Sequence, residues 1–221
     1  MSILGRRELI TRITNSELAV TPLLSPNQIG TSSIDLRMGN VALMARARGS
    51  SHVDPALAKS ERRQSPYVAE LRRQQKHERY ELPFGAELLL HPGSLALVPT
   101  LEWIRLPRDL MGEVTARSTW AREGLSIATA TLIEPEYEGI VTLELANLGQ
   151  IPIALYPGLK IAQISFSEVV NHGERKDDSQ FKGSFSPWQG ELAKDDELPF
   201  LPDKIAALCS RDAGGAGPHG A

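Results

Sequence analysis

Three consecutive residues of this chain carry groups that suit a phosphorylated ligand. Arg117, Ser118 and Thr119 place a guanidinium and two hydroxyls at the start of a predicted short helix, residues 118–123. A helix N-terminus adds unpaired N–H groups and the positive end of the helix dipole, so this cluster could bind phosphate. Arg122 lies one turn after Ser118, on the same helical face. The alternative, in which Ser118 merely caps the helix and Arg117 is a surface residue, stays open.

Glu144 is the second group that could do chemistry. It belongs to residues 141–147, where Val141, Leu143 and Leu145 share one side of a predicted strand and Glu144 faces the other. A carboxylate beside an arginine suits general acid-base catalysis, because the guanidinium orients it and offsets part of the cost of burying its charge. The alternative is an exposed strand glutamate with no catalytic role.

Two other chemistries lack the residues they need. His172-Gly173-Glu174 matches half of the zinc nucleobase deaminase signature, but the Pro-Cys-x-x-Cys half is absent and the chain has one cysteine, Cys209. No Gly-x-x-x-x-Gly-Lys-Ser/Thr loop occurs either, so any phosphate must be held in another way. We therefore expect neither a zinc deaminase site nor a P-loop.

Composition narrows the class of protein. The chain has 221 residues and a net charge of -3, which predicts one soluble globular domain and gives no basic excess for binding nucleic acid. The apolar tracts are far shorter than a membrane span, and residues 1–7 lack the apolar run of a signal peptide. Together with the lone Cys209, this predicts a cytoplasmic protein.

The pattern of apolar residues predicts a mainly β fold. Residues 6–13 have helical spacing and residues 33–43 alternate as a strand. From Tyr80 onward, short apolar runs alternate with Pro and Gly turns, which favours a β-sandwich or barrel over a parallel α/β sheet.

Two other segments differ from this pattern. Residues 45–80 carry mixed charges and a helical-looking stretch, 67–73, which predicts a solvated insertion; a nucleic-acid patch is the weaker reading because aromatic residues are nearly absent. Residues 212–218 have too little apolar content to pack, so we expect the end of the chain to be disordered.

Five motifs resemble those of the dCTP deaminases, in the same order and with nearly the same spacing. The dCTP deaminases share a superfamily with the trimeric dUTPases. The resemblance runs, with gaps, from Met1 to about Phe185. The matching segments are 32–39 (family Ser-Ile-Asp-Leu-Arg-Leu-Gly), 116–122 (Gly-Arg-Ser-Ser-x-x-Arg), 129–139 (Thr-Ala-His-x-Ile-Asp-Pro-Gly-Trp-x-Gly), 143–147 (Leu-Glu-x-x-Asn) and 157–166 (Pro-Gly-x-x-Ile-x-x-x-x-Phe), with His91-Pro92-Gly93 as the turn before the core.

This resemblance implies an architecture and a reaction. It implies a single domain over residues 1–200, a distorted β-barrel of the dUTPase-like type with a few short helices, and a homotrimer with active sites between subunits. Residues 179–200 would form a C-terminal lid and residues 201–221 a tail. The implied reaction is hydrolytic deamination of dCTP to dUTP and ammonia without a catalytic metal, Mg2+ being bound through the nucleotide triphosphate.

The resemblance also implies roles for individual residues. Glu144 would be the general base and proton shuttle, Ser118 and the backbone carbonyl of Ala130 would hold the attacking water, and Arg122 would support Glu144. Tyr137 would pack on the deoxyribose, and Glu134 would contact the sugar. The full set of implied nucleotide contacts is Arg117, Ser118, Thr119, Thr129, Ile133, Glu134, Tyr137 and Lys182.

Departures from the family pattern leave the substrate open. Glu134 replaces an Asp, Thr131 replaces a His or Gly, Ala116 replaces a Gly, and residues 179–185 match the lid motif only loosely. The alternatives are a dUTP pyrophosphatase, alone or combined with deamination, and a non-catalytic deoxynucleotide-binding regulatory relative. A dUTPase would have an apolar residue in place of Glu144 and a glycine-rich phosphate-closing motif, which is missing, so dCTP deamination is favoured.

Overall fold

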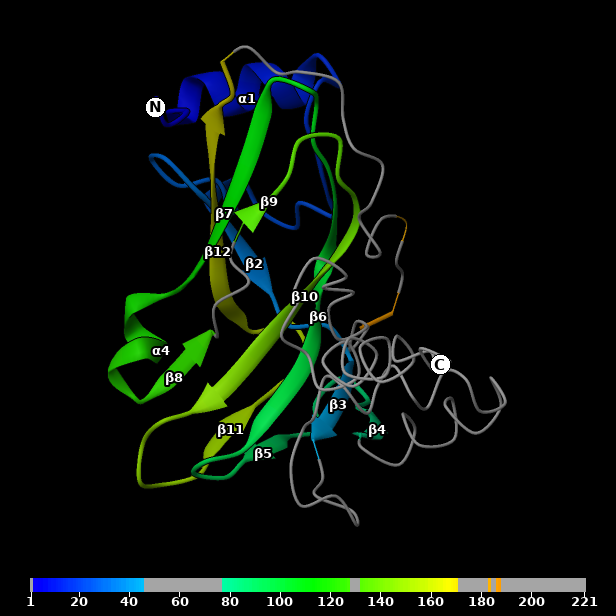
Figure 1. Ribbon diagram of the computed structural model, residues 1–221, viewed down its shortest axis with the longest axis vertical. Coiled ribbons are helices and arrows are strands. Elements are labelled where there is room, and N and C mark those ends of the chain that lie inside the picture. The colour runs from blue at the N-terminus through cyan, green and yellow to red at the C-terminus, as the bar shows by residue number, and fades with distance from the viewer. Residues whose placement is uncertain (1, 46–76, 128–131, 171–182, 184–185, 188–221) are drawn as a thin grey trace, which may run out of the picture. The chain divides into compact units, whose positions relative to one another are not determined.

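Antiparallel strands are the main regular element in the part of the chain that the computed structural model describes, which is residues 2–45, 77–127, 132–170, 183 and 186–187. These residues belong to one compact unit, formed by Met1–Arg46 and His77–Gly190 (Figure 1). The predicted insertion helix at 67–73 and the tail at 201–221 lie outside the described residues, and the predicted domain limits stay predictions.

The described elements are few helices and many short strands. In chain order they are α1 (Arg6–Thr14), β1 (Ala19–Thr21), the 3-10 turn η1 (Pro26–Gln28), β2 (Ile34–Arg37), β3 (Val41–Ala45), β4 (His77–Glu81), β5 (Leu88–Leu90), β6 (Leu95–Arg105), β7 (Leu110–Ala116), α4 (Ser118–Arg122), β8 (Leu125–Ile127), β9 (Leu132–Ile133), β10 (Glu138–Asn147), β11 (Ile153–Leu155) and β12 (Lys160–Glu168). None of the helices within these ranges has the length and apolarity needed to cross a membrane.

The strands form three antiparallel sheets. Strands β4, β3, β6, β10 and β8 lie side by side in that order, with β1 also paired to β6. A four-stranded sheet has the order β2, β12, β7, β9, and β11 pairs with β5. The mainly β prediction is therefore confirmed.

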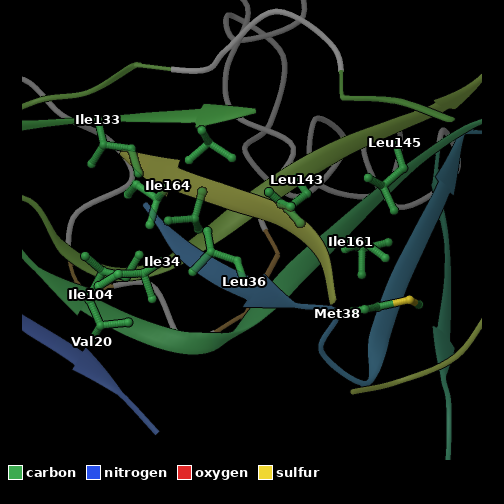
Figure 2. Packing of buried hydrophobic residues seen from close by; sticks show 14 of the residues in the cluster. Val20, Ile34, Leu36, Met38, Ile104, Ile133, Leu143, Leu145, Ile161 and Ile164 are labelled. Atoms are coloured by element: carbon green, nitrogen blue, oxygen red, sulfur yellow. The ribbon is translucent and has the colours of Figure 1, made fainter. Parts of the chain in front are cut away.

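One hydrophobic cluster joins the two larger sheets (Figure 2). Ile34, Leu36 and Ile164 come from the four-stranded sheet, and Ile104 and Leu143 come from the six-stranded sheet. Each of these side chains is at most 1% exposed. Burial of a large aliphatic side chain stabilises the folded state by about 1.5–3 kcal/mol, so this shared core is what holds the two sheets together.

The predicted N-terminal helix is confirmed as α1, whereas the predicted strand at 33–43 is wrong as a single element. It is divided into β2 and β3, which belong to different sheets. Gly39 lies between them, and its N–H donates to the carbonyl of Pro99 over 2.8 Å. A Cβ at Gly39 would lie 2.9 Å from that carbonyl oxygen, so a glycine is required where the chain passes from one sheet to the other.

The predicted insertion at 45–80 overlaps two strands. Ala45 ends β3, and residues 77–80 belong to β4, which pairs with β3 from Val41↔Glu81 to Ala45↔His77. Residues 77–80 carry no clear strand signal in the sequence, because β4 has exposed and half-buried positions rather than a fully buried face. Its charged residues therefore resembled those of the insertion.

Candidate functional site

Helix α4 begins at Ser118, as the sequence predicts, and ends at Arg122, one residue earlier than expected. Arg117 occupies the N-cap position with extended backbone and makes no side-chain capping bond. Ser118 is therefore the first helical residue and not the cap. Both Ser118 and Thr119 are exposed, and neither hydroxyl is hydrogen-bonded within the described residues, which leaves both available to a ligand.

The start of β12 holds the beginning of α4 in place. Trp120 donates its indole N–H to the carbonyl of Lys160 over 2.9 Å, and the backbone N–H of Arg117 donates to the carbonyl of Ile161 over 3.2 Å. Trp120 is half-buried and packs against the hydrophobic core. The position of Arg117 therefore depends on β12, which begins 40 residues after Trp120.

The end of α4 rests on the turn that follows β10. Gly124 has a φ of 90°, and its carbonyl accepts a hydrogen bond from the N–H of Leu148 over 2.9 Å. A Cβ at Gly124 would lie 2.7 Å from the backbone nitrogen of Gly149. The two backbones are thus in direct contact, and this contact sets where Arg122 lies relative to β10.

Asn147, the last residue of β10, fixes that turn. Its Oδ1 accepts from the N–H of Gly149 over 2.8 Å, and its Nδ2 donates to the carbonyls of Leu90 and Ile151, each over 2.8 Å. With 1% of its surface exposed, Asn147 has its amide fully used. Sequence reasoning assigned no role to Asn147, although it ends the motif at 143–147.

Glu144 lies on the outward face of β10, as the alternation predicts. Val141, Leu143 and Leu145 are 7%, 1% and 0% exposed, and Glu144 is half-buried on the other side. Its cross-strand neighbour is Leu97 of β6, so the side chain next to it on this face is aliphatic. Among the described residues, the Glu144 carboxylate makes no hydrogen bond or ion pair, and it is therefore available to a substrate or water.

The described residues do not bring Arg122 and Glu144 together. Arg122 is exposed, and no ion pair joins it to Glu144 within these ranges. Thr129, Ala130 and Lys182 lie outside the described residues, so their predicted roles stay predictions. Strand β8, which pairs with β10 from Leu145↔Ile127 to Asn147↔Leu125, ends just before Thr129 and Ala130.

Tyr137 lies at the turn that leads into β10. Its hydroxyl donates to the carbonyl of Ile140 over 2.5 Å, and burial raises the pKa of Tyr137 to about 12. The phenol therefore stays neutral at ordinary pH. Glu134 is exposed nearby, whereas the side chain of Ile133 is 6% exposed and belongs to the core, which leaves its backbone as the part that could contact a nucleotide.

Part of the predicted lid lies against the same strand. Gly183 donates its N–H to the carbonyl of Glu138 over 2.6 Å, and Pro187 is buried. Glu138 directly follows Tyr137, so residue 183 lies beside the predicted sugar-binding position.

Arg117 also has an unpredicted partner. Its Nη1 lies 3.4 Å from Oδ2 of Asp35 in β2, and Nζ of Lys160 lies 3.0 Å from the same oxygen. Asp35 and Lys160 belong to the motifs at 32–39 and 157–166, which is the signal that could have singled them out.

Within the described ranges, no group of three or more His, Cys, Asp and Glu side chains is placed to hold a metal ion.

Comparisons with known proteins point to one family. Residues 3–169 match the dCTP deaminase-like family model. A dUMP-forming dCTP deaminase of Dictyoglomus thermophilum is 36% identical over 174 residues, covering 78% of this chain and 83% of that protein. A dCTP deaminase of Natronomonas pharaonis is 34% identical over 202 residues, covering 89% of this chain and 97% of that protein.

A similar fold occurs among solved structures. The crystal structure of 2'-deoxycytidine 5'-triphosphate deaminase from Agrobacterium tumefaciens matches with a TM-score of 0.53 and 23% sequence identity. The match covers 74% of this chain and 47% of that one, so this chain corresponds to about half of the Agrobacterium chain. At this identity the likeness concerns the fold.

Proposed function

Because the chain belongs to the dCTP deaminase-like family, we propose that it hydrolyses the exocyclic amine of dCTP to give dUTP and ammonia. The observation that carries this proposal is the placement of Glu144. It is a half-buried carboxylate with an aliphatic neighbour and no partner among the described residues, in the position where the family motif has its glutamate. A general base must be free to exchange protons, and Glu144 meets that condition.

The chemical step assigns one task to each group. Glu144 takes a proton from a water molecule, the water oxygen attacks C4 of cytosine, and Glu144 delivers a proton to N3. The same carboxylate then takes the remaining proton of that water from the new C4 hydroxyl and passes it to the amine, so that the C4 carbonyl forms as the C4–N bond breaks and ammonia leaves. Ser118 and the carbonyl of Ala130 hold the water, and Arg122 orients Glu144. The exposure of Ser118 and Arg122 supports these tasks, because neither side chain is used elsewhere in the described fold.

Substrate recognition uses the groups around α4 and the start of β10. Arg117, Ser118 and Thr119, with Lys182 of the lid, bind the triphosphate, which also carries Mg2+. Tyr137 packs on the deoxyribose and excludes a 2'-hydroxyl. Its hydroxyl is already bonded to a backbone carbonyl, so the ring is held in one orientation. The remaining nucleotide contacts are assigned to Thr129, to the backbone of Ile133, and to Glu134 beside the sugar.

A homotrimer would bring these groups together. The described fold leaves Arg122 and Glu144 unpaired within one chain, which is the arrangement expected if a neighbouring subunit completes the site. We therefore propose a trimer with active sites between subunits. We further propose a distorted β-barrel subunit, supported by the antiparallel sheets, and a cytoplasmic location, supported by the lone Cys209. Light scattering measures the stoichiometry. A monomer that deaminates dCTP at full rate would contradict the shared site.

Formation of dUMP is a second candidate outcome. Several relatives are named as dUMP-forming dCTP deaminases, among them those of Dictyoglomus thermophilum, Dictyoglomus turgidum and Methanobrevibacter smithii. Incubation with dCTP and Mg2+ followed by product identification separates the candidates. Deamination alone yields dUTP and ammonia, the bifunctional reaction yields dUMP, pyrophosphate and ammonia, and a non-catalytic relative yields no product.

A further inference from the structure

One carboxylate oxygen links three distant segments of the chain. Oδ2 of Asp35 in β2 lies 3.0 Å from Nζ of Lys160 in β12 and 3.4 Å from Nη1 of Arg117, which precedes α4. The three side chains are 17%, 26% and 34% exposed, respectively. Because the groups are partly buried, water screens their interaction less than it would on an open surface.

A buried hydrogen-bond network holds the strand that carries Asp35. Glu102 is fully buried and accepts hydrogen bonds from Nε2 of Gln28 over 2.7 Å and from the backbone N–H of Arg37 over 2.8 Å. Nε2 of Gln28 also donates to the backbone carbonyl of Asp35 over 2.9 Å. Strand β2 is the edge of its sheet, and this network binds its free side. The backbone of Asp35, from which the carboxylate projects, is therefore held in place.

Lys160 is the closer of the two cations to Asp35. The guanidinium of Arg37 is engaged elsewhere, since its Nη1 donates to the carbonyl of Gly158 over 2.7 Å. Among the residues that the structure describes, two positive charges thus share the single negative charge of Asp35, which leaves a net charge of one positive. Within the described residues, the Arg117 side chain uses only Nη1, at 3.4 Å, so its other N–H groups remain available to an anion.

We propose that Lys160 is a positioning residue for binding of the substrate phosphates. It neutralises Asp35, so that Asp35 orients the guanidinium of Arg117 without consuming its charge, and Arg117 can then bind the triphosphate of the nucleotide. This inference rests on the proposed role of Arg117 in phosphate binding. Without Lys160, the negative charge of Asp35 would draw Arg117 closer and repel the phosphates.

The test compares substitutions that change the charge balance around Asp35. For Lys160→Met we expect KM and Kd for dCTP to rise about ten-fold while kcat changes by less than about two-fold, because binding and not the chemistry is affected. Lys160→Arg should retain most of the affinity. The double variant Asp35→Asn/Lys160→Met should recover most of the affinity lost in Lys160→Met, because the unpaired carboxylate is gone.

Arg7→Met is the matched control, since it removes one positive charge from the exposed surface of α1, well separated from α4 in Figure 1. Thermal unfolding of each variant identifies any that fails to fold. If Lys160→Met does not fold, the Kd of the double variant for dCTP tests the inference instead. Unchanged dCTP affinity in Lys160→Met, or no recovery in the double variant, overturns the inference.

The wild-type protein separates this inference from the proposed function. If it binds dCTP without releasing ammonia, the deamination proposal fails and the affinities still test Lys160. If it deaminates dCTP and Lys160→Met binds dCTP normally, the inference about Lys160 alone fails. A wild-type protein that does not bind dCTP overturns both.

Discussion

Glu144 and Asp35 are both half-buried carboxylates on strands, and their surroundings are opposite. Asp35 has two cationic partners on one oxygen, and its strand is tied to a buried glutamate. Glu144 has an aliphatic cross-strand neighbour and no partner among the described residues. A carboxylate held by cations is suited to orient them, whereas a carboxylate without a partner is free to move protons. The contrast distinguishes a binding region from a chemical one.

The largest expected effect comes from removing the proton-transfer group. Glu144→Gln keeps the size and hydrogen-bonding capacity of the side chain but removes the base. We expect kcat to fall about 100 to 10,000-fold with little change in Kd for dCTP. Steady-state kinetics and equilibrium binding measure the two quantities. A variant that retains a third of the wild-type rate would show that Glu144 is not the proton-transfer group and that its role does not differ from that of Asp35 in this way.

A smaller effect is expected where α4 meets the turn after β10. Gly124→Ala places a methyl group on a residue with a φ of 90° and within 2.7 Å of the nitrogen of Gly149. We expect the free energy of unfolding to fall by about 2–4 kcal/mol and kcat to fall, because the helix that carries Arg122 must move. Urea unfolding and turnover measure these changes.

Gly85→Ala is the control for this substitution. Gly85 has a φ of 93°, but a Cβ there would meet no atom within 4 Å. It should therefore lose about 1–2 kcal/mol through backbone strain alone and keep its activity. Equal losses in the two variants would show that the contact between Gly124 and Gly149 contributes nothing to stability or to the position of α4.

Glu102, the buried carboxyl group whose hydrogen bonds hold β2 in place, should make the stability of the protein depend on pH. Burial raises the pKa of Glu102, and its hydrogen bonds with Arg37 and Gln28 only partly oppose that effect. The folded state thus holds the proton more tightly than the unfolded state. The stabilising contribution of Glu102 is complete below its unfolded pKa and is lost as the pH rises through its folded pKa.

Glu102→Gln isolates this contribution. The free energy of unfolding of the wild-type protein, minus that of the variant, should decrease as the pH is raised from acidic to neutral values. Urea unfolding at a series of pH values measures the difference. A difference independent of pH across this range would show that Glu102 does not titrate with folding.

The smallest effect is expected from metal exchange. After complete chelation, Mg2+ alone should restore full deamination, because Mg2+ is carried by the triphosphate and Glu144 generates the nucleophile without a Lewis acid. Turnover with each added metal provides the measurement. Recovery only with Zn2+ would mean that the free carboxylate of Glu144 is not sufficient for the chemistry.

Sequence alone was enough for features that depend on neighbours a few residues away. Helix α1, the start of α4 at Ser118 and the outward placement of Glu144 all follow from local periodicity, because side-chain direction repeats every 3.6 residues in a helix and every two in a strand. The mainly β class follows from the same signal together with the Pro and Gly turns.

Only the tertiary structure decided how distant backbones and charges meet. The predicted strand at 33–43 is divided because Gly39 passes directly over Pro99, and α4 is seated because Gly124 touches Gly149. Asp35, Arg117 and Lys160 converge because β2 and β12 pair, and because α4 is anchored to the start of β12. Such contacts depend on sheet pairing between segments many residues apart, which local periodicity does not encode.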